Sequence, residues 1–338
     1  MSSDKWMEAG KKGMKKTITV LILCAMLFAL SFPASAAQHA AKIPRIGFLS
    51  PFSSSDTPHQ AFREGLRDLG WVEGKNITIE YRYANGSDSR LPDLVADLIR
   101  QKVDIIVTSV TTDTLAAKSA TSTIPIVMAA GDPLVTGIVA SLARPGANIT
   151  GLSQMAPELS GKRLEVLKEI VPKLSRVAVL WNPEIRVSTF SWEEMQHPAR
   201  ELKVQAHSLE IRSPDDLEKA FEKATKARVD ALVIMPDPVT RTNLKRIAEL
   251  AIKHRLPSVF HIREFAEVGG LMAYGPDRSD LFRRAATYVD KILKGTKPAD
   301  LPVEQPMKFE LIFNLKAANQ IGLTIPPNVL VRADRVIK

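Results

Sequence analysis

From residue 45 onward, short apolar runs alternate along the chain with amphipathic stretches of helical period. In the first half the strand candidates are 45–49, 77–83, 103–107 and 124–128. The helix candidates between them are 58–69, 89–101 and 112–120. A strand, a helix and a second strand form the repeating unit of parallel sheets that carry helices on both faces. The alternation therefore predicts an α/β fold.

The same alternation starts again at residue 176 and predicts a second lobe of the same architecture. Its strand candidates are 176–181, 207–211, 231–235, 257–260 and 270–274. Ser213 to Asp216 is typical of a helix start, and Gly295 is typical of the end of a long helix predicted over 277–294. Each lobe would have about the size of a small domain.

The last part of the chain departs from this alternation. A proline-containing stretch leads to a strand candidate at 309–313, and Asn314 is placed to cap a short helix after it. These elements are too few for a third domain, so we expect them to complete the two lobes already described. A chain that visits one lobe, then the other, and returns crosses between them several times, and such crossings form a hinge.

Small polar residues follow most of the predicted strands. In open parallel sheets, ligands bind beyond the carboxyl ends of the strands. Hydroxyl groups and unpaired N–H groups at helix N-termini favour an anionic group. Ser50, Ser109 and Thr112 are therefore our candidates for binding a ligand carboxylate. Plain helix capping is the alternative for each, because serine and threonine are common N-cap residues.

Two aspartates, Asp132 and Asp237, follow other predicted strands. An ionised carboxylate only accepts hydrogen bonds, so either residue suits a ligand ammonium or hydroxyl group. Each also precedes a proline, where aspartate commonly stabilises a turn, and that is the alternative. Asn182, after the first strand of the second half, completes the polar candidates.

Aromatic side chains at strand ends offer surfaces on which a ligand could stack. Phe52 and Tyr274 are our candidates for contacting an apolar or aromatic ligand side chain. Trp181 is a third aromatic residue at a strand end, but it closes a buried strand, and packing in the core is the alternative for it.

The short motifs of common enzyme classes are absent from the sequence, which contains no G-x-S-x-G, Walker A, G-x-G-x-x-G or H-E-x-x-H pattern. A serine hydrolase built from scattered residues stays open, because such triads are recognised by geometry. The six histidines show no metal-ligand spacing, and we expect neither a metal nor a cofactor. The net charge of +9 is spread along the chain without a basic block, which disfavours a nucleic-acid partner.

Residues 1–36 have the pattern of an export signal. Lys15 and Lys16 precede an apolar run at 18–30, and a small-residue site ends at Ala36. We expect cleavage after Ala36 and a location in the periplasm. A retained N-terminal anchor is the alternative. The only cysteine, Cys24, follows the bulky Leu23, which disfavours a lipid-anchored form.

Several segments resemble the substrate-binding proteins of ABC transporters, in the branch grouped with tryptophan- and tyrosine-type uptake systems. The segments of the first half are 45–49, 62–71, 73–77, 131–137, 141–146 and 148–151. Those of the second half are 269–275, 288–295 and 297–305. The resemblance covers nearly all of the chain after residue 36, and it is specific for the family although not for a ligand.

The resemblance implies a type I periplasmic-binding fold, in which two flavodoxin-like lobes are joined by a three-crossing hinge and enclose the ligand. We accordingly divide the chain into lobe 1, at 44–152 plus 276–298, and lobe 2, at 153–275 plus 299–338. In that fold Ser50, Ser109, Asp132 and Tyr274 fall on loops that face the cleft.

The resemblance also implies the solute-binding component of an importer and not an enzyme. We expect a monomer that captures a small carboxylate-bearing solute, an amino acid with an apolar or aromatic side chain, and delivers it to a membrane permease and its ATPase. A ligand-sensing subunit that reports to a membrane receptor is the alternative. A cytoplasmic regulator is disfavoured by the export signal and by the missing helix-turn-helix before residue 45.

Overall fold

The computed structural model describes residues 42–54 and 58–338. Residues from Pro44 to Lys338 form one compact unit. The predicted export signal and its cleavage site lie outside the described residues. Within the described part of the chain, no helix combines the length and the apolar character that a membrane span requires.

The first lobe is built on a five-stranded sheet in the order β2-β1-β3-β4-β5, in which every pairing is parallel. Its strands are β1 (Arg45–Ser50), β2 (Thr78–Tyr83), β3 (Ile105–Thr108), β4 (Ile126–Gly131) and β5 (Ile149–Ser153). Strands β1, β3, β4 and β5 are mostly buried because helices cover both faces, whereas the edge strand β2 is mostly half-buried.

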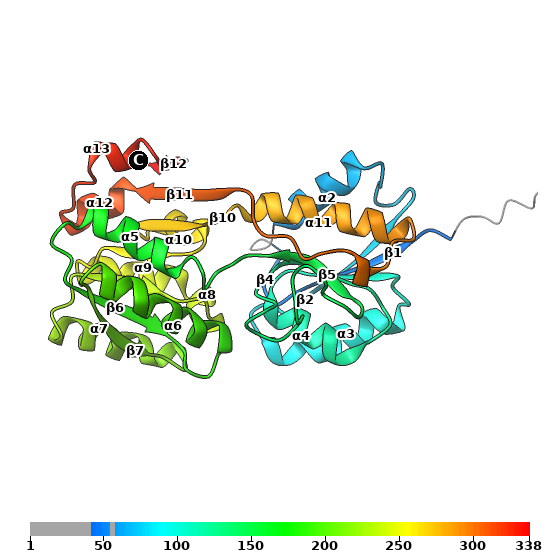
Figure 1. The fold of residues 1–338 in the computed structure, drawn as a ribbon, viewed down its shortest axis with the longest axis horizontal. Helices are drawn as coiled ribbons and strands as arrows, with labels where there is room; N and C mark the ends of the chain where they lie inside the picture. Colours follow the sequence, from blue (N-terminus) through cyan, green and yellow to red (C-terminus); the bar gives the residue numbers. More distant parts are fainter. Residues whose placement is uncertain (1–41, 55–57) are drawn as a thin grey trace, which may run out of the picture. The chain divides into compact units, whose positions relative to one another are not determined.

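Four helices cover this sheet, two on each face. Phe62 and Leu66 of α2 (His59–Asp68) share one apolar core with Phe282 of α11 (Arg278–Leu293). Helices α3 (Leu91–Arg100) and α4 (Thr111–Ala120) pack in a separate core on the other face. Figure 1 shows α2 and α11 above this sheet and α3 and α4 below it.

The second lobe is built on a seven-stranded sheet in the order β12-β11-β10-β9-β8-β6-β7. Its strands are β6 (Arg176–Trp181), β7 (Gln205–Glu210), β8 (Ala231–Ile234), β9 (Ser258–Phe260), β10 (Met272–Pro276), β11 (Phe309–Asn314) and β12 (Arg335–Ile337). Strand β11 runs antiparallel to β10, and the other pairings are parallel. The late strand predicted at 309–313 therefore extends the second sheet, as expected.

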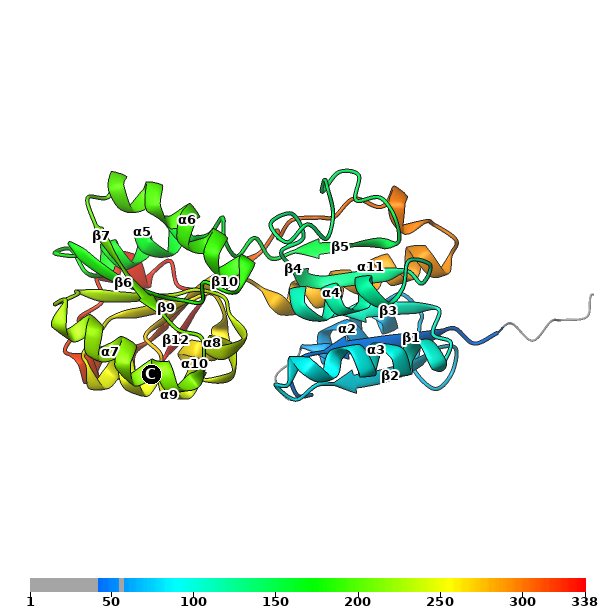
Figure 2. The same ribbon diagram turned by 90° about the horizontal axis from the view of Figure 1, so that it is seen from below.

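Two apolar cores flank this second sheet. One contains residues of α5 (Ser160–Ile170), α6 (Arg186–Glu201), α12 (Leu315–Ile321) and α13 (Pro327–Leu330). The other contains residues of α7 (Leu217–Lys226), α9 (Leu244–Lys253) and α10 (Arg263–Glu267). Figure 2 shows α5 and α6 on one side of the sheet and α7 and α9 on the other. The short helix α8 (Pro238–Thr242) follows β8.

The chain passes from one sheet to the other after β5, after β10 and again before β11. Helix α11 follows β10 of the second sheet in the chain, yet it packs against α2 of the first lobe. Leu301 and Val303 also pack in the cores of the first lobe, and Val303 N–H donates to the Leu142 carbonyl over 2.7 Å. The lobe boundaries at 152/153, 275/276 and 298/299 stay a prediction.

The α/β class predicted from the alternation is confirmed, with strand ends displaced by a few residues. Asn314 accepts the Ala317 N–H and caps α12, as predicted. Among the described strands, β5 and β12 are those that the periodicity did not predict. Strand β5 contains Gly151 at a φ of +132°, and glycine is unfavourable in a strand on propensity alone. Its backbone passes so close to β4 that a Cβ on Gly151 would lie 2.1 Å from the Met128 carbonyl oxygen.

Candidate functional site

Ser50 and Ser109 meet at the carboxyl ends of β1 and β3, which are neighbours in the first sheet. Both are fully buried, and their Oγ atoms lie 3.1 Å apart. The Ser109 Oγ also lies 3.0 Å from Asp113 Oδ2. Because a hydroxyl group has a single hydrogen, Ser109 can donate to only one of these two acceptors, and both belong to the protein.

Asp113, in the first turn of α4, was not among the sequence candidates. Its carboxylate accepts the N–H groups of Ser109 (2.6 Å), Val110 (3.0 Å) and Thr114 (3.0 Å). Burial raises its pKa to about 7, against the lowering effect of these hydrogen bonds. Asp113 thus satisfies the donors at this helix start, where we expected a ligand anion. A carboxylate within the first turn was the available sequence signal.

Thr112, also in this turn, is only half-buried. Its neighbour Thr111 is the residue that connects this turn to the next strand end, because its Oγ1 accepts the Asp132 N–H over 3.0 Å. The carboxylate-binding role of Thr112, like those of Ser50 and Ser109, stays a prediction.

Asp132 is buried just after β4, and its carboxylate is bound to the segment that leaves the first sheet. Its Oδ2 accepts the Gln154 side-chain amide (2.7 Å) and its Oδ1 accepts the Ala156 N–H (2.9 Å). Burial raises its pKa to about 6, although both hydrogen bonds lower it. Asp132 therefore holds the segment that follows β5 by hydrogen bonds, and each of its carboxylate oxygens already accepts one donor of the protein.

Asp237 and Asn182 lie at the carboxyl ends of β8 and β6, which are neighbours in the second sheet. Asp237 Oδ1 caps α8 by accepting the N–H groups of Val239 (2.6 Å) and Thr240 (3.2 Å). Its Oδ2 is buried and accepts no hydrogen bond from the residues that the structure describes. Burial raises the pKa of Asp237, while the Thr240 N–H lowers it, as does the Asn182 side-chain amide, which approaches the carboxylate without the geometry of a hydrogen bond.

The aromatic candidates differ in their surroundings. Phe52, half-buried after β1, lies under the guanidinium of Arg241 from α8, whose Cζ is 4.8 Å from the ring centroid. Tyr274 stacks on Phe309 at a centroid distance of 6.4 Å. Trp181 stacks on Trp192 at 5.5 Å and packs against the second-lobe core, which is the alternative stated for it.

A charged cluster that the sequence reasoning missed lies beyond β8, β9 and β10. The guanidinium groups of Arg241 and Arg278 approach the same oxygen, Glu264 Oε1, at 3.2 and 3.3 Å. Arg278 is 6 % exposed, and its Nη2 has no hydrogen-bond partner in the described part of the chain. The buried His261 stands near both arginines and near Arg163, and burial together with these cations lowers its pKa well below 6.5.

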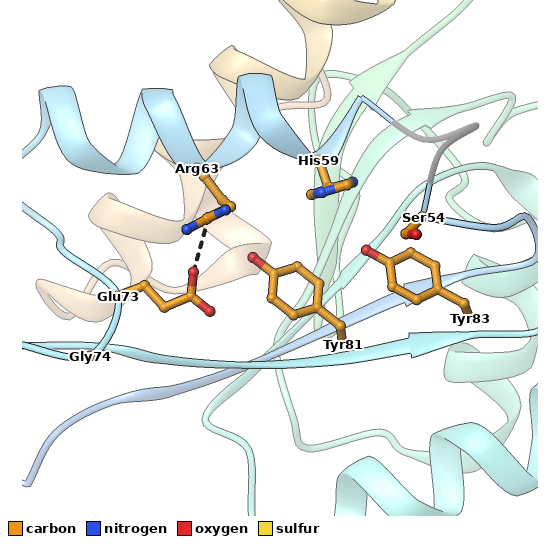
Figure 3. A pocket seen from close by; sticks show the side chains of 7 residues that line it. All are labelled: Ser54, His59, Arg63, Glu73, Gly74, Tyr81 and Tyr83. Atoms are coloured by element: carbon orange, nitrogen blue, oxygen red, sulfur yellow. Dashed lines mark ion pairs between the residues drawn. The ribbon is translucent and has the colours of Figure 1, made fainter.

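A cavity of about 540 Å³ lies beside β2 in the first lobe. Figure 3 shows the rings of Tyr81 and Tyr83 side by side, with His59 above them and the Arg63–Glu73 ion pair next to Tyr81. The two tyrosine rings are parallel to within 5° at 6.1 Å. All of its lining residues belong to one lobe. A ligand held there would not contact the second lobe, so the strand ends remain the better candidate site.

In the described residues, no group of three or more histidine, cysteine, aspartate or glutamate side chains is arranged to hold a metal ion. The candidate site therefore consists of hydroxyl, amide, carboxylate and guanidinium groups at strand ends. Such groups bind polar and charged parts of a small organic molecule by hydrogen bonds and ion pairs.

Comparison with known proteins gives consistent results. Residues 48–337 match the family described as ABC transporter substrate binding protein. A tyrosine-binding protein of Clostridioides difficile is 25% identical over 289 residues, which is 84% of this chain and 83% of that protein. A domain from Streptococcus pneumonia, solved in complex with L-Trp, is 26% identical with a TM-score of 0.80, over 87% of this chain and 99% of that one. A leucine-binding protein from Thermotoga maritima shares the type I periplasmic-binding fold, with a TM-score of 0.55, 18% identity and coverage of 76% and 77%.

Proposed function

The chain belongs to the substrate-binding proteins of ABC transporters, and from this premise we propose that it captures an amino acid with an apolar or aromatic side chain for a membrane permease. Members of this family bind solutes outside the cytoplasm and are not enzymes. The names of its relatives support the ligand class, because one is a tyrosine-binding protein and another was solved with L-Trp.

The observation that carries this proposal is the buried, unpartnered Oδ2 of Asp237 at a strand end. A buried carboxylate oxygen without a donor is costly unless a ligand supplies one, and an ammonium group has three. Asn182 lies beside it, and Phe52 at the end of β1 offers an aromatic face. We propose that Asp237 binds the ligand ammonium and that Phe52 and Tyr274 contact its side chain.

Closure about the hinge would couple binding to recognition by the permease. Contacts already join helices of the second lobe to loops of the first lobe: Arg186 donates to the Val135 carbonyl, and Arg241 covers the Phe52 ring. A ligand that touches both lobes stabilises the form in which they are together, since only that form offers both sets of contacts. We propose that the exported protein acts as a monomer.

The test begins with protein lacking residues 1–36, unfolded and refolded to remove bound solute. L-tryptophan, L-tyrosine and L-leucine are then screened by thermal unfolding and by calorimetric titration. A ligand at about 100 times its Kd adds about 2.7 kcal/mol to the free energy of unfolding, so the melting temperature should rise by several degrees. X-ray scattering should show a smaller radius of gyration with ligand. No binding of any amino acid would contradict the proposal.

A further inference from the structure

The position of the ligand carboxylate follows from which donors the protein has not used. At the start of α4, Asp113 accepts the N–H groups of Ser109, Val110 and Thr114. The Ser109 hydroxyl lies between Ser50 Oγ and Asp113 Oδ2. A second carboxylate placed here would displace internal hydrogen bonds and would meet the charge of Asp113 whenever that group is ionised.

Arg278 differs from the start of α4, because it is a buried cation with a hydrogen-bond donor that no described residue accepts. Its Nη1 lies 3.3 Å from Glu264 Oε1, an oxygen that also lies 3.2 Å from Arg241. Its Nη2 is buried and donates to none of the described residues. Burial lowers its pKa to about 10, so it stays protonated at neutral pH. A buried guanidinium nitrogen that donates to nothing is costly, and a carboxylate is its best partner.

The place of Arg278 in the chain puts it at the candidate site. It is the first residue of α11, directly after β10, at one of the passages between the two sheets. Glu264 belongs to the second lobe, whereas Phe282, whose ring centroid lies 5.7 Å from the Arg278 Cζ, packs in the first-lobe core. Asp113 of the first lobe acts on its charge as well.

Arg278 also belongs to the same cluster as the proposed ammonium site. Asp237 caps α8, Arg241 of α8 contacts Glu264, and Glu264 contacts Arg278. Strands β8 and β10 are separated by β9 alone, so their ends lie about 10 Å apart. An α-amino acid between them could meet Asp237 with its ammonium group and Arg278 with its carboxylate.

We propose that Arg278 binds the ligand carboxylate through Nη2, in place of the serine and threonine hydroxyls at the ends of β1 and β3. The inference rests on the proposed amino-acid function and assigns its specificity for a free carboxylate to one residue. Two nitrogens of Arg163 also have no partner among the described residues, but this side chain is fully enclosed and donates to Ala156 and Ser160 of its own segment.

The test compares L-tryptophan with L-tryptophan methyl ester, which keeps the ammonium group and the indole ring but lacks the carboxylate. Kd values are measured by calorimetry for the unchanged protein and for Arg278→Gln. The unchanged protein should bind the acid at least roughly 30-fold more tightly than the ester, the lower end of the effect of removing one partner of a buried charge pair. Arg278→Gln should bind the acid and the ester with nearly equal Kd.

Two further variants serve as controls. Arg263→Gln changes a nearby arginine that is paired with Asp277 and Glu310, and it should keep the preference for the acid. Arg278→Lys keeps the charge and protects the test if Arg278→Gln fails to fold, which thermal unfolding will show. Lysine lacks the planar fork, so the preference for the acid should be reduced but not lost.

Other results would overturn the proposal. An equal loss of acid and ester affinity in Arg278→Gln would mean that Arg278 only supports the fold. If Arg278→Gln keeps the preference for the acid and Ser109→Ala loses it, the ligand carboxylate binds to the serine and threonine hydroxyl groups instead. A preference lost only in Arg163→Gln would assign it to that residue. If the unchanged protein binds the acid and the ester alike, it has no carboxylate site. If it binds no amino acid, the proposed function fails and this inference fails with it.

Discussion

Replacing Asp237 by asparagine should weaken amino-acid binding and leave the protein folded. The asparagine Oδ1 can still accept the Val239 and Thr240 N–H groups, and asparagine caps helices about as well as aspartate. The amide nitrogen, however, would replace the unpartnered Oδ2 and would turn a donor toward the ligand ammonium.

The size of the effect follows from the kind of contact that is lost. Removing one partner of a buried, hydrogen-bonded charge pair costs about 2–5 kcal/mol, which raises Kd by roughly 30-fold to a few thousand-fold. The cap is retained, so the free energy of unfolding of the ligand-free protein should change by less than about 1 kcal/mol. Calorimetric titration with L-tryptophan measures the first quantity and urea unfolding measures the second.

Asp132→Asn is the matched control, because both Asp132 oxygens already hold donors of the protein. Its Oδ1 can keep the Ala156 N–H, and the Gln154 amide can turn to present its oxygen to the new NH₂ group. We therefore expect nearly unchanged affinity. Normal affinity in Asp237→Asn together with a large loss in Asp132→Asn would refute the assignment of the ammonium site to Asp237.

Three further predictions concern the first lobe, pH and export. Gly151→Ala should lower the free energy of unfolding by about 2–5 kcal/mol, because a Cβ at a φ of +132° would meet the β4 backbone at 2.1 Å. Gly74→Ala is the control: its φ is +80° and no atom lies within 4 Å of the new Cβ, so it should lose only the stability that the unfavourable φ costs. Equal losses of unfolding free energy for the two variants in urea unfolding would contradict a clash between the Gly151 Cβ and β4. Burial raises the pKa of Asp113 to about 7 and that of Asp132 to about 6, above the value of about 3.9 for an unfolded aspartate. Between these values the folded protein therefore binds more protons than the unfolded chain. These groups should make the free energy of unfolding fall as pH rises from about 4 to about 7. In urea unfolding without ligand, Asp113→Asn should show a smaller fall than the unchanged protein. Mass spectrometry of the exported protein should find Ala37 at its N-terminus, and a lipidated Cys24 there would contradict the cleavage site.

The sequence by itself determined the α/β class and the positions at which the candidate residues stand. Apolar periodicity is local, so each buried strand and each amphipathic helix leaves a pattern within its own residues. Capping is local too, and for this reason the sequence alone predicts the cap that Asn314 forms by accepting the Ala317 N–H. The pattern did not predict strand β5, because Gly151 lowers its strand propensity. Only the close approach of the neighbouring strand β4 explains why a glycine is needed there.

Only the tertiary structure decided which polar groups are already used. The partners of Asp132, Gln154 and Ala156, lie beyond the next strand, so the sequence could not show that its oxygens are occupied. Arg278 stands at a strand end like the other candidates, yet its significance depends on contacts with Arg241 and Glu264 from neighbouring strand ends. A side chain's residue type fixes how many hydrogen bonds it can make, whereas the fold determines which of them the protein itself satisfies.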